Sequence, residues 1–249
     1  MPKIHWESAP NVSVDTRNAN LVVVEKLGLP KHRGAGRLAV VGGGPSINEH
    51  IEELKNWPGE IWAINGTINW CIDHGIDAWF YTCDASGPDV WPYDLSRITK
   101  AVLTSDGNPA MIEHLRGLGA VVELVGPPQS GPTSANASDY LAIECGYTGV
   151  TYFGCEGSFS KAETGADTHG FKTGYAIDDW MIIELGGEHF KTKNEYISSA
   201  IMLSVTISEF PDIYEEKSGG LLRAMIQHGI KYEEVMVSNS LYAKLRDAA

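Results

Sequence analysis

A glycine-rich turn after an apolar run is the first place in this sequence where chemistry is expected. The β-prone residues 38–41 are followed by Gly42, Gly43, Gly44, Pro45 and Ser46, and then by an amphipathic stretch. Glycine permits tight turns and close approach of the backbone to a ligand, and the free amides at a helix N-terminus favour an anion. We therefore expect a strand, a turn and a helix that together bind a phosphate group.

This turn differs from the two best-known phosphate loops. A P-loop ends in Gly-Lys-Ser/Thr, and no lysine follows Gly44 here. The dinucleotide pattern needs a third glycine, where this chain has Ile47, and an acidic residue after the second strand, where it has Asn65. The pattern indicates a Rossmann-like phosphate turn that does not bind NAD, and a purely structural turn is the alternative.

A histidine and an aspartate in a polar segment are the candidate catalytic groups. Residues 158–175 are polar, contain glycine and show no periodicity, as in lids and binding loops. The imidazole of His169 can take a proton from an acceptor hydroxyl near neutral pH, and Asp167 can orient the ring. The alternatives are a surface or structural histidine and a solvated carboxylate.

Four more polar residues stand where predicted elements begin or end. Thr133 and Ser134 precede an alanine-rich helix, which they can cap or at whose N-terminus they can bind an anion. Asp84 and Glu156 each follow an apolar run and can contact a sugar hydroxyl or a metal ion. For both carboxylates, capping of a turn is the alternative.

The elements that position these residues predict an α/β fold. Such alternation of short apolar runs with helices is typical of a Rossmann-like, mostly parallel sheet with helices on both faces, which binds ligands at the carboxyl ends of its strands. The apolar runs lie at residues 38–41, 61–64, 78–82, 101–104, 121–125 and 150–153, and the intervening helices at 48–56, 67–74, 109–118 and 134–145.

The chain divides into a short N-terminal cap or linker, residues 1–36, and a Rossmann-like nucleotide-binding domain, residues 37–249. The cap contains a predicted helix at residues 15–29. Within the domain, the lid loop at about 158–175 precedes a helical C-terminal part at about 193–235, with helices predicted at 194–209 and 221–228.

The order of these motifs resembles the superfamily that joins bacterial sialyltransferases, motility accessory factors and archaeal 6-hydroxymethylpterin diphosphokinases. The resemblance covers about residues 37–235. It rests on GGGPS at 42–46, Asn65, Asp84, GPTS at 131–134, YFGCE at 152–156 and DTHG at 167–170.

The resemblance implies a Rossmann-like nucleotide transferase. In sialyltransferases of this kind, the G-P-S loop and the asparagine hold a cytidine monophosphate donor, which implies that Gly44, Ser46, Asn65, Thr133 and Ser134 contact the donor. The chain departs from the pattern at Glu156, where the family usually has aspartate, and at Ala135, which replaces the glycine of T-S-G. These departures put the sugar or metal contact in question and leave the sugar unidentified.

Three functions remain open at this point. The favoured one is a sialyltransferase-like glycosyltransferase that uses a CMP-type nucleotide sugar, with no obligatory metal. The second is a diphosphokinase that transfers diphosphate from ATP to a pterin-like alcohol, with Mg²⁺ held by Asp84 and Glu156, together with Asp167. The third is a nucleotide-binding module without catalysis. The acceptor can be a glycan, a protein or a small alcohol.

The composition indicates which binding partners and which cellular compartment to expect. A net charge of −13 argues against a nucleic-acid surface, because phosphate backbones select lysine and arginine. The four cysteines show no CxxC spacing, so we expect core thiols in a reducing compartment. With no signal peptide and no run of about 18 apolar residues, we expect a cytoplasmic protein without a membrane span. A homo-oligomer remains open.

Overall fold

The computed structural model describes residues 12–85, 94–128, 132–158 and 181–229. Most of the predicted lid loop, including Asp167 and His169, lies outside these residues. Within them, every helix is too short or too polar to cross a bilayer.

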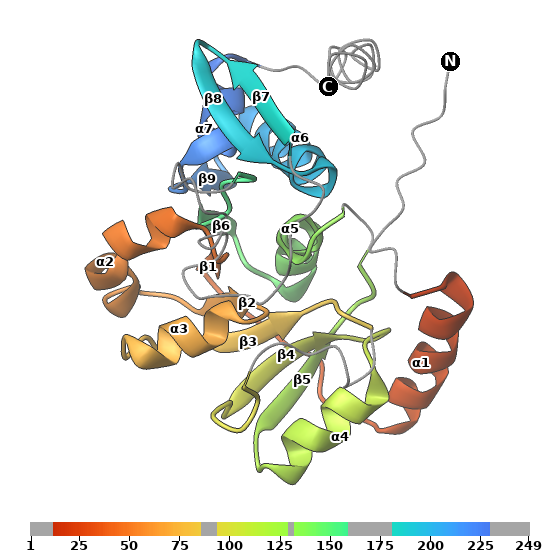
Figure 1. Ribbon diagram of the computed structural model, residues 1–249. Coiled ribbons are helices and arrows are strands. Elements are labelled where there is room, and N and C mark those ends of the chain that lie inside the picture. The colour runs from red at the N-terminus through yellow and green to blue at the C-terminus, as the bar shows by residue number, and fades with distance from the viewer. Residues whose placement is uncertain (1–11, 86–93, 129–131, 159–180, 230–249) are drawn as a thin grey trace.

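Seven parallel strands form the main sheet in the order β5-β4-β3-β2-β1-β6-β9 (Figure 1). This confirms the predicted parallel Rossmann-like sheet. The sheet grows from β1 in one direction through β2 and in the other through β6, so the strand order reverses between β1 and β6. Ligands of such sheets bind at this switch point. The strands are β1 (Arg37–Val41), β2 (Ile61–Ile64), β3 (Trp79–Thr82), β4 (Lys100–Thr104), β5 (Val121–Val125), β6 (Gly149–Phe153) and β9 (Tyr214–Glu216).

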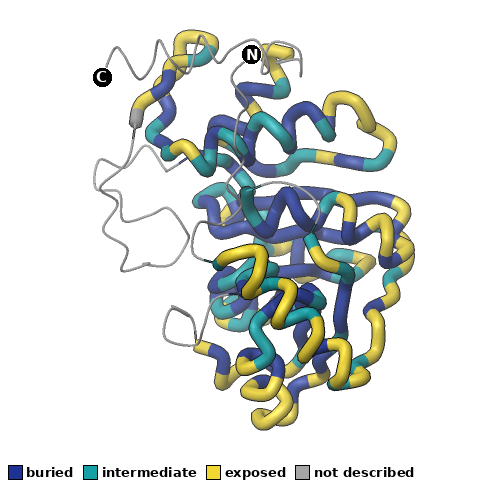
Figure 2. The backbone as a smooth tube through the Cα atoms, turned by 90° about the vertical axis from the view of Figure 1, so that its right-hand side faces the viewer, coloured by how far each residue is buried: buried dark blue, intermediate teal, exposed yellow. Residues whose placement is uncertain are grey.

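Helices cover both faces of the sheet, as the alternation predicted. Because successive side chains of a strand point to opposite faces, Val40 packs in one core with α5, α6 and α7, and Val41 packs in the other with α2, α3 and α4. Figure 2 shows the buried strands in the interior and the exposed segments around them. The helices are α1 (Val14–Lys26), α2 (Ile51–Lys55), α3 (Thr67–Asp73), α4 (Pro109–Gly117), α5 (Ser134–Cys145), α6 (Asn194–Glu209) and α7 (Gly220–Gln227).

One prediction of secondary structure was wrong, because the single helix expected at 48–56 is a 3-10 helix, η1 (Pro45–Glu49), followed by the one-turn α2. The C-terminal part contains both predicted helices. It also contains the unpredicted strand β9, which joins the main sheet beside β6, and an unpredicted antiparallel hairpin precedes α6. The hairpin strands are β7 (Met181–Leu185) and β8 (Glu188–Thr192).

The N-terminal segment contacts the rest of the fold at two places. The helix α1 is capped by Ser13, whose hydroxyl accepts the amide proton of Thr16 at 3.1 Å, and it packs beside α4 (Figure 1). Further along, Lys31 forms a parallel bridge with Leu124 of β5, and His32 is buried. The predicted linker therefore also extends the sheet.

Candidate functional site

The turn after β1 packs directly on the turn after β6. The amide of Gly42 donates to the carbonyl oxygen of Phe153, and the amide of Gly44 donates to that of Gly154, both at 2.8 Å. A Cβ on Gly42 would lie 2.5 Å from the Gly154 oxygen and 2.9 Å from the sulfur of Cys155. This packing requires glycine at position 42, whether or not a ligand approaches the turn.

The carboxyl group of Glu156 covers the same turn. Glu156 is 4% exposed, and its Oε1 accepts the amide proton of Ser46 at 2.7 Å. A Cβ on Gly44 would lie 1.2 Å from Glu156 Oε2, so the carboxyl group fills the space that a side chain at position 44 would need. The structure thus places a carboxyl group of the chain where the sequence predicted a phosphate. Phosphate binding at this turn stays a prediction.

The helix after the turn supplies less of a dipole than expected. Gly44 is the N-cap of η1, which spans five residues and has no side-chain capping bond. The amide of Ile47 is already bonded to the Gly44 carbonyl oxygen at 3.3 Å. Since the helix dipole arises from aligned peptide groups, a single 3-10 turn attracts an anion less strongly than a long α-helix would.

Two carboxyl groups near this turn, the buried Glu156 and the partly buried Glu216, have raised pKa values. Burial raises the pKa of Glu156, and the hydrogen bond from Ser46 and the charge of Arg223 oppose this effect. Burial also raises the pKa of Glu216, which pairs with Arg223 at 3.3 Å between Oε2 and Nε. Both carboxyl groups therefore hold a proton more tightly than usual.

The start of α7 closes over the end of β6. The backbone at Gly220 has a positive φ of 58°, and a Cβ there would lie 2.8 Å from the Glu156 Cβ and 2.4 Å from Ser158 Oγ. The amide of Leu222 donates to the Glu156 carbonyl oxygen at 2.8 Å, and that of Leu221 donates to Ser158 Oγ at 3.1 Å. These contacts fix the backbone of Glu156 against α7.

Asn65 lies at the end of β2 with a left-handed backbone. Its φ is 49°, and its amide donates to the Tyr81 carbonyl oxygen at 2.9 Å. Its side-chain Oδ1 is buried and has no hydrogen-bond partner among the described residues. Asparagine tolerates this backbone region better than most residues, and the hydrogen-bonding capacity of its buried oxygen is unused among the described residues.

Thr133 acts as a helix cap, the alternative that the sequence left open. Its Oγ1 donates to Asn136 Oδ1 at 2.8 Å, accepts the Asn136 amide proton at 3.4 Å and lies 2.9 Å from Ser199 Oγ. Ser134 is 7% exposed, and its hydroxyl lies 3.0 Å from the sulfur of Cys83. The Ser134 hydroxyl therefore has fewer hydrogen-bond partners than the Thr133 hydroxyl.

The structure does not bring Asp84 and Glu156 together. Asp84 follows β3, where its amide donates to Thr82 Oγ1 at 3.0 Å, and Glu156 follows β6. Three strand spacings, about 14 Å, separate β3 from β6 in the sheet. Over the described part of the chain, no group of three or more His, Cys, Asp or Glu residues is arranged to hold a metal.

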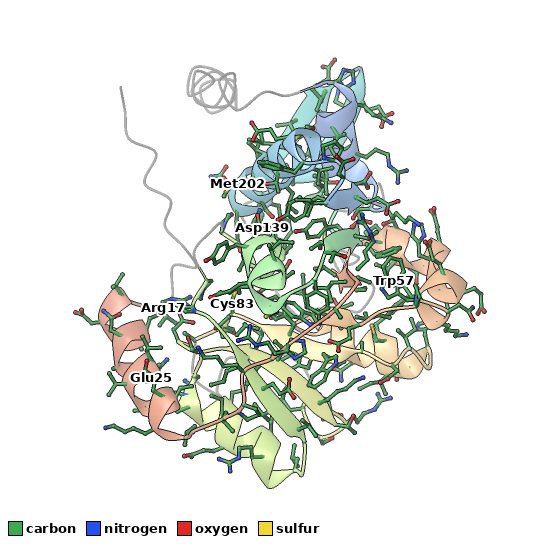
Figure 3. The ribbon with its side chains drawn as sticks, turned by 180° about the vertical axis from the view of Figure 1, so that it is seen from behind. Arg17, Glu25, Trp57, Cys83, Asp139 and Met202 are labelled. Carbon is green, nitrogen blue, oxygen red and sulfur yellow. The ribbon has the colours of Figure 1, made fainter. Side chains whose placement is uncertain are left out.

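An ion pair between Arg17 and Asp106 lies at the carboxyl ends of the strands and was not predicted from the sequence. Arg17 of α1 donates from Nη1 to Asp106 Oδ2 at 2.7 Å and to the Cys83 carbonyl oxygen at 3.5 Å. Figure 3 shows Arg17 beside the part of the sheet where Cys83 lies. Asp106 comes just after the strand predicted at 101–104. Because ligands of parallel sheets bind at the carboxyl ends of the strands, this position could have identified Asp106 as a candidate site residue. Nothing in the sequence points to Arg17, because its position depends on how α1 docks.

The four cysteines are free thiols, as expected. Burial raises the pKa of Cys83 to about 11 and places the pKa of Cys155 well above its usual range. Neither thiol is activated as a nucleophile in these surroundings.

Comparisons with known proteins agree with this architecture. No protein-family model matches the chain, and neither does any curated protein sequence. Among solved structures, the chain is similar to the MAf glycosyltransferase from Magnetospirillum magneticum AMB-1, with a TM-score of 0.57 and 14% sequence identity. The similarity covers 83% of this chain and 37% of that one, so the chain spans little more than a third of its neighbour. The two proteins share a fold, and motility accessory factors are one of the three groups that the motif order resembles.

Proposed function

We propose that this chain is a glycosyltransferase that moves a sugar from a CMP-type nucleotide donor to an acceptor hydroxyl. The donor binds along the carboxyl edge of the sheet, with its phosphate at the turn after β1. The proposal rests on the distribution of unpaired polar groups along that edge.

Nine buried side-chain nitrogen and oxygen atoms have no hydrogen-bond partner among the described residues, and five of them are oxygens at the strand ends. Buried polar atoms are normally paired, so each exception needs an explanation. A polar ligand along the carboxyl ends would satisfy these five oxygens, which is the position that this topology predicts for a ligand. The atoms are Asn65 Oδ1 after β2, Thr104 Oγ1 in β4, Asp106 Oδ1 after β4, Glu156 Oε2 after β6 and Glu216 Oε1 in β9. They extend the ligand edge over β2, β4, β6 and β9.

The proposed donor site uses the residues nearest the switch point. The amide of Ser46 and the backbone face of Gly44 meet the phosphate, Asn65 accepts a hydrogen bond from the nucleoside, and Ser134 donates to the donor. Asp84, two strands from β1, accepts from a hydroxyl of the transferred sugar. Thr133 supports this site as the cap of α5.

The proposed reaction breaks the bond between the anomeric carbon and the phosphate oxygen, and forms a bond from that carbon to the acceptor oxygen. The electron pair leaves with CMP, whose charge the turn stabilises. The acceptor proton passes to His169, which Asp167 orients. Both residues belong to the predicted lid loop.

A melting-temperature panel tests the donor class. CMP and a CMP-linked sugar should raise the melting temperature in the presence of a chelator, because a ligand that binds only the folded state stabilises it by mass action. UMP, GMP and ADP at equal concentration serve as control ligands, and they should raise the melting temperature less than CMP does.

Other outcomes would identify the alternatives. Stabilisation by ATP that requires Mg²⁺ would favour the diphosphokinase. CMP binding without hydrolysis or transfer of any CMP-linked sugar would favour a binding module. If no nucleotide changes the melting temperature, the proposed function is wrong.

A further inference from the structure

The side chain of Glu156 holds one of the backbone amides that the glycine turn could offer to a ligand. Backbone carbonyl oxygens already accept the amides of Gly42, Gly44 and Ile47. The amide of Ser46 is instead held by a side chain, through Glu156 Oε1 at 2.7 Å. A ligand can therefore obtain the Ser46 amide by displacing one side chain, without breaking the backbone contacts of the turn.

We propose that Glu156 is an internal occupant of this site, which the phosphate of an incoming ligand must displace from Ser46 and from the face of Gly44. The identification of that ligand as a CMP-type donor rests on the proposed function, but the displacement itself does not. The role differs from the substrate contact that the sequence predicted for Glu156.

Space is the first reason that Glu156 and a phosphate exclude one another. Oε2 lies 1.2 Å from the position of a Cβ on Gly44, so it rests directly on the backbone that a phosphate would approach. Glu156 is 4% exposed, and α7 packs against it from the other side, with the Cβ position of Gly220 3.1 Å from Glu156 Cγ. A phosphate oxygen cannot reach the Ser46 amide while Oε1 holds it.

Charge is the second reason. A phosphate beside an ionised carboxylate in a buried site meets strong repulsion, because the local dielectric screens little. Glu216 adds a second, partly buried carboxyl group, and Arg223 is the cation paired with it. Oε2 of Glu156 has no partner among the described residues, whereas Oε1 accepts the Ser46 amide proton, so this is the hydrogen bond that a displacement would break.

The backbone of Glu156 supports a displacement of the side chain alone. Its carbonyl oxygen accepts the Leu222 amide proton at 2.8 Å, and the neighbouring amide of Cys155 donates to Ser218 Oγ at 2.8 Å. These bonds do not involve the carboxyl group, and they persist when it moves.

Displacement of Glu156 lowers the affinity for every anion by the same factor, so it leaves the ratio of their affinities unchanged. Inorganic phosphate has to displace Glu156 with its own contacts alone, whereas a nucleotide gains further contacts, at Asn65 and Ser134 in the proposed site. At a given concentration, the cost therefore removes most of the bound phosphate while a tightly bound nucleotide still occupies the site. The turn should therefore bind inorganic phosphate poorly in the wild type.

Titration calorimetry on the full chain tests the proposal with inorganic phosphate and CMP as probes. Glu156→Ala removes the occupant and should bind phosphate at least tenfold more tightly than the wild type. Glu156→Gln removes the charge but keeps a group on Ser46, so its affinity should lie between the two. Glu52→Gln is the control, since it makes the same charge change at a side chain 80% exposed on α2.

Each result decides the proposal. Tighter phosphate binding by Glu156→Ala supports it, and if CMP then binds no variant, the occupant role stands while the proposed function fails. Weaker binding of CMP and phosphate by Glu156→Ala would show a direct ligand contact and overturn the proposal, as would phosphate binding by none of the variants. If Glu156→Ala does not fold, Glu156→Gln decides, and an affinity equal to that of the wild type would contradict the proposal.

Discussion

The Glu156 carboxyl group lies where a side chain on Gly44 would have to be, with Oε2 1.2 Å from the position of the missing Cβ. The φ and ψ of Gly44, −68° and 154°, are ordinary for any residue. The backbone therefore does not require glycine at this position. The requirement comes from a residue more than a hundred positions later in the chain.

Gly44→Ala should consequently lower the free energy of unfolding by roughly 1–3 kcal/mol, the usual cost of overpacking a buried site. In the double variant with Glu156→Ala, much of this loss should disappear, because the clashing group is gone. Chemical denaturation of the four proteins of this cycle measures the coupling. Gly117→Ala, on α4 with nothing within 4 Å of its Cβ position, should be neutral or slightly stabilising. Strict additivity of the two changes would contradict the packing described here.

Asn65→Gly separates the backbone role of Asn65 from its proposed ligand contact. Glycine accepts the φ of 49°, so the fold should keep its stability, whereas alanine would add backbone strain. The unpartnered Oδ1 is lost, and CMP affinity should fall by roughly 1–3 kcal/mol. Calorimetry measures the affinity, and an unchanged value would remove Asn65 from the donor site.

Arg17→Met should destabilise the protein by roughly 3–5 kcal/mol, because it leaves Asp106 buried and unpaired. The side chains of Arg17 and Asp106 are 16% and 6% exposed. Adding Asp106→Leu should recover most of this loss. The control is Arg97→Met, which breaks the exposed pair with Asp73 and should cost less than about 1 kcal/mol. Equal losses in both single variants would show that the pair does not hold α1 on the sheet.

The strands of this fold could be predicted from sequence because most are short apolar runs buried on both faces. All six predicted strands are present, in a parallel sheet. The seventh, β9, has the sequence Tyr-Glu-Glu and no apolar run that could reveal it. The hairpin could have been found from Gly186-Gly187, since two residues with positive φ are typical of tight hairpin turns.

The candidate site was harder to predict because its contacts join distant parts of the chain. The sequence identified the glycine turn and Glu156 separately, but their contact follows from the pairing of β1 with β6. Likewise, Thr133 can bind an anion or cap a helix, and the choice depends on Asn136 and Ser199. The strand-end rule indicates where a ligand can bind, and packing decides which polar groups are left for it.

The raised pKa of Glu156 predicts how stability depends on pH. The folded state binds the proton more tightly than the unfolded chain, so this group contributes stability below the unfolded pKa, near 4.5, that is lost as pH rises through the folded pKa. Glu156→Gln cannot ionise and should not show this loss. Between pH 4.5 and the folded pKa, its stability relative to the wild type should therefore increase by about 1.4 kcal/mol for each pH unit. Parallel curves of unfolding free energy against pH would mean that the pKa is not raised.

The catalytic role of His169 is the prediction on which the proposed function depends most directly. His169→Ala should leave the affinity for CMP near that of the wild type and lower sugar transfer roughly 10²–10⁴-fold, the usual contribution of a positioned base. Transfer by the wild type should also fall on the acid side near pH 6.5 if the imidazole keeps its ordinary pKa, because the protonated ring cannot accept the acceptor proton. Asp167→Asn should reduce transfer by less, since that residue acts through the ring. The control is His189→Ala, because the side chain of His189 is 69% exposed on β8 and lies in no part of the proposed site. Transfer that survives His169→Ala with an unchanged pH profile would assign the base to another residue, and equal loss of CMP binding would make His169 a ligand contact instead.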